Sequence, residues 1–467
     1  MIKLFVHASV SCVIAILLYA VGLLDLEVRA EQSAPTQADT QAVETKNVDQ
    51  VFYPGPQPPS EKVESSIGPL KVRLYGTLLM NVSVSDTNVA GQDVPLWSFP
   101  DGSAATFPDS STRRNGNIHD LIFTARQSVF GLNLSAANPS ANAWVSTARV
   151  ELDFFGVRPS DTFQPGSRVF NQPRLRLAYF QIEKGMWKVT AGQDRAIIAP
   201  LDPVSLSHVA VPLAATAGNL WGWLPQVRLD HTHKFGRTAT LLQFGVLRPQ
   251  FGDPALRDLP APGTAVDSNF SGFGERSSHP FYQARMAVSH PMQGSTATIG
   301  AAAHYGRESV GSDRNLDSWA FALDLTIPLQ SRLTLHGEGF VGSNLIPFQG
   351  GVLQGVAAVR PGRIQRIGAG GGWAELTIYP TPGNKNIVYL GGGTDDPRNA
   401  NLLPGTNRSK NSVVWASYFR KMTDQVSLGL EWSNWQTRTI AFVGLSPGPR
   451  GPFGSANVFN TALAYQF

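Results

Sequence analysis

Residues 457–467, NVFNTALAYQF, end the chain on an alternating pattern that closes with a Phe. One set of alternate positions is mostly apolar or aromatic, which is the period expected of a β-strand. Its members are Phe459, Thr461, Leu463, Tyr465 and Phe467. A soluble sheet would rarely leave a terminal Phe in water, whereas a barrel in a membrane places aromatic side chains at the lipid–water boundary. The stretch therefore favours a membrane barrel whose last strand ends at that boundary.

Residues 1–30 have the pattern of a removed signal peptide. Lys3 precedes an apolar run from Val10 to Leu24, and Val28-Arg29-Ala30 offers small residues at a plausible cleavage point. The run is short and early for a membrane helix. Cys12 is the only cysteine, so the mature chain would have none, which excludes a disulfide scaffold and a thiolate metal site. We therefore expect an exported protein.

Charge and composition narrow the remaining classes of protein. The 467 residues include 38 Lys and Arg against 34 Asp and Glu, a formal net charge of +4. These charges are scattered, so nothing suggests a nucleic-acid partner. Beyond residue 30, no apolar run approaches the length of a spanning helix, so a chain that crosses a membrane must do so with strands. Residues 31–69 are small, polar and rich in Pro, and we expect a flexible periplasmic lead there.

About sixteen strand-like segments fill residues 70–467, which we assign to a barrel. Tight turns rich in Gly, Pro and Asn alternate with long connections throughout this region. A closed, antiparallel, up-and-down transmembrane barrel has this asymmetry, with short periplasmic turns and long outer loops. The expected fold is therefore all-β. The strand-like segments are 71–84, 118–134, 144–155, 174–183, 187–194, 225–233, 238–247, 280–290, 296–305, 318–328, 332–342, 367–379, 386–395, 413–421, 425–434 and 457–467. The long connections lie near 85–117, 157–173, 195–224, 248–279, 306–317, 343–366, 396–412 and 436–456.

The two faces of individual strands favour lipid outside and water inside. In the segment 318–328, Trp319 and Phe321 share one face, and Asp324 lies on the other. The segment 425–434 divides in the same way. A soluble barrel of this size would need its interior filled by apolar side chains, and here the second face is polar. The alternation therefore predicts a water-filled lumen.

Residues 174–203, RLRLAYFQIEKGMWKVTAGQDRAIIAPLDP, resemble a strand–turn–strand unit of the general bacterial porins. In that superfamily an Arg-bearing strand ends in an aromatic residue, and a Gly-Gln strand leads into the third extracellular loop. The stretch Leu74-Tyr75-Gly76 and the terminal Phe467 fit as well. The chain also resembles the DcaP-like porins, although residues 31–69 lack the coiled-coil lead that those proteins can carry. The resemblance implies a homotrimer and a third extracellular loop folded inward.

The resemblance gives residues 195–224 the role of that third loop. The stretch is long and mostly apolar, with Asp202 as its one acidic residue. So apolar a loop would be unusual on a surface in water. Folded into the lumen, it would form the constriction of the pore. Trp221 and Trp223 either line this constriction or anchor the next strand at the outer interface.

Strand faces also predict which charges line the pore. Basic residues should dominate the inward faces of the first six strands, opposite a third loop that is nearly devoid of acids. General porins place an arginine ladder opposite acidic residues of that loop, so this departure implies a positive field and a preference for anions. Alternatively, the arginines form ion pairs with lumen carboxylates such as Glu151 and Asp153. The residues expected at the pore lining or constriction are Arg73, Arg126, Arg149, Arg174, Arg176, Lys188, Asp194, Asp202, Arg228 and Asp230.

Two polar constellations suggest sites of other kinds. His231 and His233 share a strand face, as a metal pair would, but the apolar neighbours on that face direct them towards lipid near a periplasmic turn. We therefore expect an interfacial role for them and no bound metal. Ser205 and His208, with Asp202, include the residue types of a hydrolase triad, but no G-x-S-x-G elbow accompanies them. Catalysis there is the weaker interpretation.

The glycine runs 368–372 and 391–393 do not indicate phosphate binding. They lack the following helix or Lys that a phosphate cradle requires. We expect these small residues to let strands bend or to let neighbouring barrels pack closely.

The leading hypothesis is an outer-membrane porin, a trimeric passive diffusion channel for small hydrophilic solutes, anionic or neutral. Such a channel contacts outer-membrane lipid, makes and breaks no bond, and needs no cofactor, so we do not expect an enzyme. The first alternative is a barrel enzyme that hydrolyses lipids or polymers at the outer membrane. The second is a structural anchor in which residues 31–69 tether the barrel to the cell wall.

Overall fold

The computed structural model describes residues 64–67, 70–91, 93–106, 112–114, 119–136, 144–156, 171–251, 272–310, 315–359, 363–381 and 384–467. The expected signal peptide, residues 1–30, and residues 31–63 of the expected lead lie outside this set. Within it, no helix is long and apolar enough to cross a bilayer.

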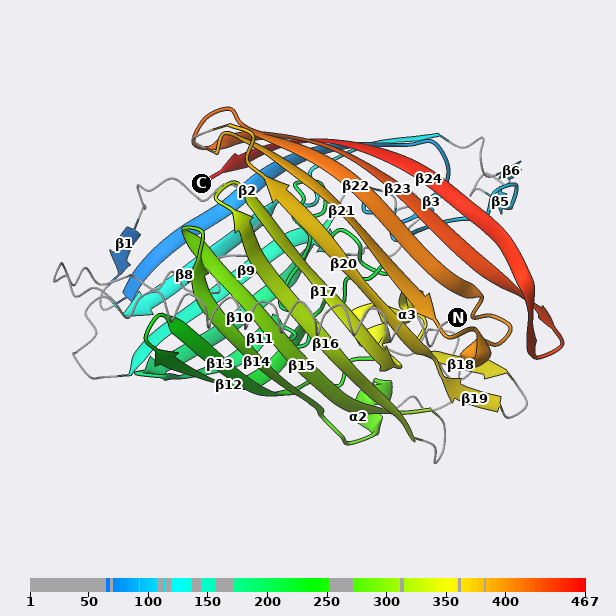
Figure 1. Ribbon diagram of the computed structural model, residues 1–467, viewed down its shortest axis with the longest axis horizontal. Helices are drawn as coiled ribbons and strands as arrows, with labels where there is room; N and C mark the ends of the chain where they lie inside the picture. The colour runs from blue at the N-terminus through cyan, green and yellow to red at the C-terminus, as the bar shows by residue number, and fades with distance from the viewer. Residues whose placement is uncertain are drawn as a thin grey trace, which may run out of the picture. The chain divides into compact units, whose positions relative to one another are not determined.

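Sixteen antiparallel strands form the wall of a closed barrel (Figure 1). Strands that follow one another along the chain are hydrogen-bonded neighbours, and the first wall strand, β2, pairs with the last, β24, to close the ring. The all-β fold and the strand number predicted from the sequence are confirmed. The wall consists of β2 (Leu70–Ser85), β7 (Asp120–Thr124) with β8 (Val129–Ala136), β9 (Val145–Gly156), β10 (Gln172–Lys184), β11 (Trp187–Arg195), β12 (Trp223–Phe235), β13 (Thr238–Leu247), β14 (Phe281–Met292), β15 (Ser295–Ser309), β16 (Asn315–Gln330), β17 (Leu333–Ser343), β20 (Gly368–Ile378), β21 (Asn386–Pro397), β22 (Arg408–Lys421), β23 (Val426–Val443) and β24 (Ser446–Gln466).

Short elements occupy the connections. A four-residue strand precedes the wall and pairs with the start of β2. The remaining pieces are two-stranded ribbons and single helical turns in the long connections. These elements are β1 (Glu64–Ile67), β3 (Val89–Ala90) with β4 (Trp97–Ser98), β5 (Ala104–Thr106) with β6 (Thr112–Arg114), β18 (Val356–Val359) with β19 (Arg363–Arg366), the helices α2 (Phe273–Arg276) and α3 (Gly350–Leu353), and the 3-10 turns η4 (Ile346–Phe348) and η5 (Asn399–Asn401).

Side chains alternate between the two faces of the wall. On β24, Phe459, Leu463 and Tyr465 are exposed, while Asn460, Ala462 and Ala464 between them are buried. The exposed large apolar residues of the other wall strands follow the same alternation. A sheet that is apolar on its convex side suits a lipid solvent, and the opposite side faces the barrel interior.

One strand and one connection differ from the sequence-based prediction. The segment expected as one strand over 118–134 is broken at residues 125–128, where the Ser128 hydroxyl accepts a hydrogen bond from the Leu79 amide in place of a ladder contact. The prediction of a long loop at 436–456 was wrong, because β23 and β24 continue through this stretch as a paired hairpin that turns at Gly444. The Pro and Gly residues of this stretch favour a loop when the sequence is considered alone. A strand that is paired on one side only tolerates such residues.

The terminal Phe completes the seam between β2 and β24. The Gly76 amide donates to the Phe467 carbonyl at 3.1 Å, and the Phe467 amide donates back to the Gly76 carbonyl at 3.2 Å. The Phe467 ring lies 5.9 Å from the Phe130 ring, centroid to centroid. It also covers the space beside Gly76, where an added Cβ would meet the ring at 2.6 Å and the Val129 carbonyl oxygen at 2.5 Å. Gly76 is therefore the residue that admits the terminal aromatic ring.

Replacing this glycine should weaken the closed barrel. We expect Gly76→Ala to lower the free energy of unfolding by about 1–3 kcal/mol, because backbone and ring must both move to accept the new methyl group. The matched control is Gly339→Ala in β17, where the added Cβ would have its nearest neighbour at 3.8 Å. The measurement is the urea midpoint of the heat-modifiable, folded band in detergent. Equal midpoints for the two variants would refute the role of Gly76.

Candidate functional site

The 196–222 segment, which joins β11 to β12, contacts inward-facing side chains from most of the wall. It contains no helix and no strand, only an isolated bridge between Ala215 and Asn219. Nearly all of it is buried. These are the residues expected to form the third extracellular loop, and their contacts define the candidate site.

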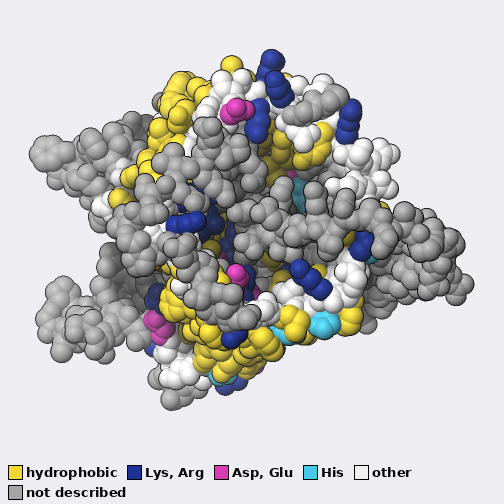
Figure 2. Space-filling model, turned by 90° about the vertical axis from the view of Figure 1, so that its left-hand side faces the viewer, with side chains coloured by type: hydrophobic (Ala, Val, Ile, Leu, Met, Phe, Trp, Pro, Cys, Tyr) yellow, Lys and Arg dark blue, Asp and Glu magenta, His cyan; other side chains and the backbone are white. Residues whose placement is uncertain are grey.

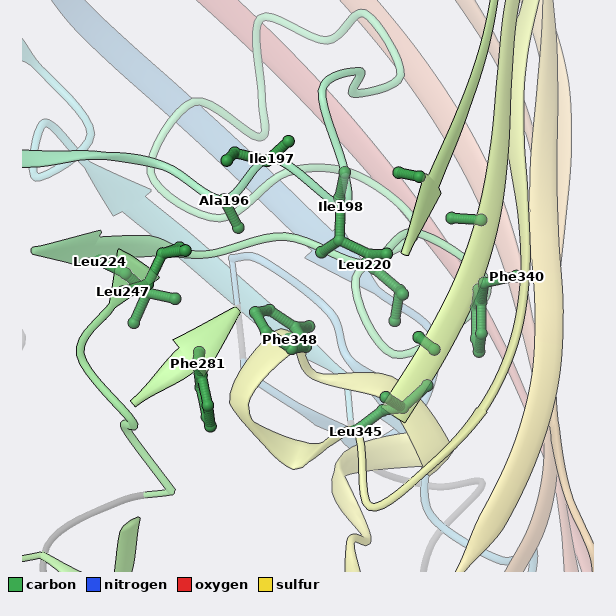
Figure 3. Packing of buried hydrophobic residues seen from close by; sticks show 14 of the residues in the cluster. Ala196, Ile197, Ile198, Leu220, Leu224, Leu247, Phe281, Phe340, Leu345 and Phe348 are labelled. Atoms are coloured by element: carbon green, nitrogen blue, oxygen red, sulfur yellow. The ribbon is translucent and has the colours of Figure 1, made fainter. Parts of the chain in front are cut away.

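Apolar side chains attach the segment to the wall in separate clusters. Ile197, Ile198 and Leu220 belong to a cluster with residues of β14 and β17, among them Phe281 and Phe340 (Figure 3). A second cluster joins the middle of the segment, including Leu213, to three tryptophans of β20, β22 and β23. A third joins Leu206 to inward residues of β2, β21, β22 and β24. The segment is therefore packed against opposite sides of the barrel interior.

Carboxylates of the later strands accept hydrogen bonds from the first half of the segment. Glu338 of β17 accepts from the Leu201 amide at 2.6 Å. Glu375 of β20 accepts from the Val204 amide at 3.0 Å. Glu431 of β23 accepts from the Ser205 hydroxyl at 2.6 Å. Buried amides need acceptors, so the carboxylates of these later strands serve in part to hold this backbone.

Donors of the early strands satisfy the carbonyls that follow. Arg174 donates to the Ala210 carbonyl at 2.7 Å, and Arg176 donates to the Val209 carbonyl at 2.9 Å. Gln127, in the break between β7 and β8, uses both ends of its amide. It accepts from the Val209 and Ala210 amides at 2.9 and 3.1 Å, and donates to the Ser207 carbonyl at 2.8 Å. The segment is thus held by acids on one side and by basic and amide groups on the other.

The glycine runs of β20 and β21 make room for the segment. A Cβ on Gly393 would lie 2.4 Å from the Ala217 carbonyl oxygen. Gly218 adopts a φ of +111°, and a Cβ there would lie 2.2 Å from the Gly372 carbonyl oxygen. Close approach of backbone to wall therefore explains these glycines, a reason that the sequence did not suggest. Gly391 similarly leaves room for the Trp415 ring.

Residues 344–355, which follow β17, brace the end of the 196–222 segment. The Trp221 amide donates to the Phe348 carbonyl at 3.2 Å, and Phe348 belongs to the apolar cluster with Leu220 (Figure 3). This brace holds an uncommon conformation, because Val352 has a φ of +53°, a region that costs a β-branched residue energy. The Asp395 carboxylate accepts from the Val352 amide at 3.0 Å and stabilises that turn.

The predicted pore residues occur mostly as ion pairs among the inward-facing side chains. Arg126 pairs with Asp93, and Arg195 pairs with Asp202. Arg73 is half-buried on β2, with Asn133 as its register partner on β8. The other pairs are Arg149 with Glu151 at 2.9 Å, Arg174 with Asp153 at 2.6 Å, Arg176 with Glu151 at 2.7 Å and with Asp153 at 3.0 Å, Lys188 with Asp230 at 3.6 Å, and Arg228 with Asp194 at 2.9 Å and with Asp230 at 3.1 Å.

Sequence reasoning missed several members of this cluster. Asp93 lies in a connection, where no periodicity assigns a face. The Phe155 ring lies between two guanidinium groups, with the Arg126 carbon at 4.0 Å and the Arg174 carbon at 5.2 Å from its centroid. Trp223 was considered in the sequence analysis, either at the constriction or as an anchor, and its ring lies 4.5 Å from the Arg176 carbon. Alternation on β9 could have placed Phe155 inward, because it shares parity with Glu151 and Asp153.

Ser205 and His208 come together without the geometry of a hydrolase triad. The Ser205 hydroxyl lies 3.2 Å from His208 Nδ1 and donates to Glu431. The same Nδ1 lies 3.0 Å from Glu431. A triad needs one imidazole nitrogen on the nucleophile and the other on the acid, whereas here one nitrogen faces both. The three side chains form a buried clip between the segment and β23.

His231 and His233 lie on the outward face of β12, as predicted. Their rings are stacked at 6.4 Å, and exposed Val227 and Leu229 lie on the same face. Among the described residues, no group of three His, Cys, Asp or Glu side chains could hold a metal ion.

Comparisons with known proteins identify the architecture. No protein-family model matches the sequence, and no curated protein matches it. The outer membrane channel DcaP of Acinetobacter baumannii matches the structure at 17% identity with a TM-score of 0.59, over 86% of this chain and 99% of that chain. The chain has the barrel fold of the outer-membrane porins. An anion-selective porin from Comamonas acidovorans matches at 12% identity, a TM-score of 0.48 and coverages of 85% and 100%. Salmonella typhi OmpF, in complex with daunomycin, matches at 11% identity with a TM-score of 0.48, over 86% of this chain and 100% of that chain.

Removing Gln127 should loosen the 196–222 segment without changing the charge of the lumen. Gln127→Ala leaves two buried amides and one carbonyl without their partner, so we expect the free energy of unfolding to fall by about 1–3 kcal/mol. In a reconstituted bilayer we also expect noisier current. The control is Gln436→Ala, since Gln436 is exposed on β23 and its side-chain amide donates to Asn434. Indistinguishable stability and noise in the two variants would contradict the role of Gln127.

Proposed function

We propose that this chain is an outer-membrane porin, a passive diffusion channel for small hydrophilic solutes with a preference for anions. The observation that carries the proposal is an asymmetry within the lumen ion pairs. In most of these pairs the basic side chain has the larger exposed fraction, and the carboxylate is more deeply buried. A solute that enters the lumen would therefore meet guanidinium and ammonium groups first.

Exposed fractions of the paired side chains support this asymmetry. Arg174 is 27% exposed and its partner Asp153 is 0% exposed. Arg195 is 34% exposed and its partner Asp202 is 10% exposed. The pairs of Arg126, Arg149 and Lys188 have the same order. Only the Arg228–Asp194 pair, in which both partners are nearly buried, departs from it in this set.

Selection in such a channel combines size and charge. The 196–222 segment narrows the passage by occupying part of the lumen, and hydrophilic solutes pass through the space that remains. The exposed cations raise the local concentration of anions and lower that of cations. Glu338, Glu375 and Glu431 oppose this field less than their number suggests, because each is engaged by the segment.

Topology supports the outer membrane as the location. The turns between β10 and β11, β12 and β13, and β14 and β15 are short, and the C-terminus lies at the same end of the barrel (Figure 1). We place this short-turn end in the periplasm, which is consistent with export by a signal peptide at residues 1–30. Lys and Arg side chains lie within the mouth at this end, and hydrophobic side chains cover the outer wall (Figure 2). A homotrimer completes the proposal, by analogy with the porin fold.

The enzyme and the anchor are weaker alternatives. A lipid hydrolase would need its Ser–His pair to face lipid, whereas Ser205 and His208 are buried against Glu431 inside the barrel. An anchor would depend on residues 31–69, of which only residues 64–67 are described. Neither alternative has an observation in its favour that matches the exposed cations of the lumen.

Planar-bilayer recording under a KCl gradient tests the proposed function. We expect conductance steps that arrive in threes, with a reversal potential that favours chloride. Steps that favour potassium would leave a porin but refute the anion preference. A folded protein that gives no steps would refute the channel itself.

Neutralising exposed lumen cations should reduce the preference for chloride. A fixed charge in a water-filled passage contributes about 1 kcal/mol or less at close range. We therefore expect Arg149→Gln with Arg174→Gln to lower the chloride-to-potassium permeability ratio roughly two- to fivefold. The control is Arg450→Gln, whose side chain is exposed near the tip of the β23–β24 hairpin. A ratio unchanged in the double variant would contradict the assignment of the field to these residues.

A further inference from the structure

The outward face of the barrel carries one polar and aromatic patch at the short-turn end. We call it the headgroup patch and define it as Lys184, Trp187, His231, His233 and Phe235. Strand register places these residues side by side. Lys184 of β10 pairs with Trp187 of β11, and Trp187 pairs with His231 of β12. His233 and Phe235 continue the same face of β12 towards its end.

Aromatic contacts make the patch continuous. The Trp187 and His231 rings lie 4.2 Å apart, and the His233 and Phe235 rings lie 4.1 Å apart, centroid to centroid. Trp187 is 46% exposed and Phe235 is 66% exposed. The patch is therefore an open surface of adjoining rings, tilted against one another, with a basic side chain at one edge.

Two rows of the neighbouring outward face differ in composition from the patch. Continuing the row of His233 across the next strands, the register gives Thr240, Val288 and Ile299. The row of His231 continues through Leu242 and Met286. None of these side chains is ionisable. In the row of Phe235, Thr238 hydrogen-bonds His290 of β14 on the same outward face. The headgroup patch differs from this neighbouring face by combining a lysine and two histidines with aromatic rings.

The position of the patch indicates the level of lipid headgroups. Lys184 is the last residue of β10 and Phe235 is the last residue of β12, so both lie at the edge of the membrane-spanning wall. Val227 and Leu229, further along the same face of β12, are exposed and apolar. Trp is favoured where hydrocarbon meets the headgroups, and Lys reaches from that level towards water.

The polar groups of the patch are mainly hydrogen-bond donors. The Lys184 side chain is exposed on this surface, and His231 and His233 are half-buried on it. A polar group on a lipid-facing surface is costly when it is left unpaired. The lysine ammonium and the indole N–H are donors without acceptor capacity, and an imidazole offers at least one N–H. Such a set matches an anion.

Carboxylates are turned away from the patch. Asp230 precedes His231 on β12 and faces the barrel interior, where it pairs with Lys188 and Arg228. Glu183 lies on the opposite face of β10 from Lys184 and has Lys188 as its register partner. The patch therefore presents donors to lipid with no competing acid on its own face.

We propose that the headgroup patch binds the phosphate of an anionic phospholipid in the leaflet at the short-turn end. Lys184 pairs with the phosphate charge, the indole and the accessible histidine N–H groups donate to its oxygens, and exposed Val227 and Leu229, further into the wall, pack against the acyl chain. The proposal rests on the placement of the barrel in a membrane, as in the proposed function. It adds a lipid class and a site that the channel activity itself does not require.

Association of spin-labelled lipids tests the proposal with the full mature chain in phosphatidylcholine vesicles. The readout is the association of labelled phosphatidylglycerol relative to labelled phosphatidylcholine, by electron paramagnetic resonance. We expect the wild type to prefer phosphatidylglycerol. The triple variant Lys184→Gln, His231→Gln, His233→Gln should lose that preference about three- to tenfold. Step conductance in a planar bilayer should be unchanged, which separates failure of this site from failure of the channel.

Arg420→Gln is the matched control, since Arg420 is also exposed and lies on the outward face of β22 at the same end. It should retain the preference for phosphatidylglycerol. Equal losses in the control and the triple variant would overturn the proposal in favour of diffuse surface charge. A wild type without preference, or a triple variant that keeps it, would also overturn it. A triple variant that changes oligomeric state would instead make the patch a contact between copies. If the triple variant folds poorly, Lys184→Gln alone, at an exposed strand end, gives the same comparison.

Discussion

The pairing of β2 with β24 is the constraint on which the rest of the structure depends. An open sheet edge in hydrocarbon would leave a row of backbone donors and acceptors without partners, so a sheet that spans a membrane must close on itself. Closure joins residues that are separated by almost the whole chain, and Thr77 meets Gln466 in the register. Gly76 and Phe467 complete this seam with two backbone hydrogen bonds. Once the ring is closed, every wall strand acquires a lipid side and an interior side.

The interior side then has to accommodate the 196–222 segment, whose backbone is withdrawn from bulk water. Its amides and carbonyls require partners inside the barrel. The wall provides negatively charged acceptors for the amides and positively charged donors for the carbonyls. Amides near Leu201 and Val204 meet carboxylates, whereas the carbonyls of Val209 and Ala210 meet guanidinium groups. This division links two observations that look unrelated along the sequence, the acidic late strands and the basic early strands. It also means that the charges that hold the segment and those that pair with one another inside the barrel come from the same strands.

The sequence predicts most of the wall and less of the site, for a physical reason. A strand with lipid on one side and water on the other must alternate apolar and polar side chains. Its presence and its inward residues can therefore be predicted from a short stretch of sequence. The break at 125–128 cannot be read in this way, because it depends on a contact between Ser128 and Leu79 that forms only in the folded barrel. Asp93 reaches Arg126 from a connection, where no alternation applies. The long hairpin over 436–456 was missed because Pro and Gly mark loops in most sheets.

That hairpin has a consequence for molecules that sit side by side in a crowded membrane. β24 pairs with β2 only from Val458 onward, so in the described part of the chain its residues before this point have β23 as their single partner strand. An unpaired strand edge is a template on which a neighbouring chain can add a strand of its own. The sequence from Ser446 to Pro452 is SPGPRGP, and its three prolines lack the amide N–H with which a strand donates to a neighbour. The prolines and the charge of Arg450 thus let the hairpin extend past the closed ring without seeding a sheet that grows from one molecule to the next.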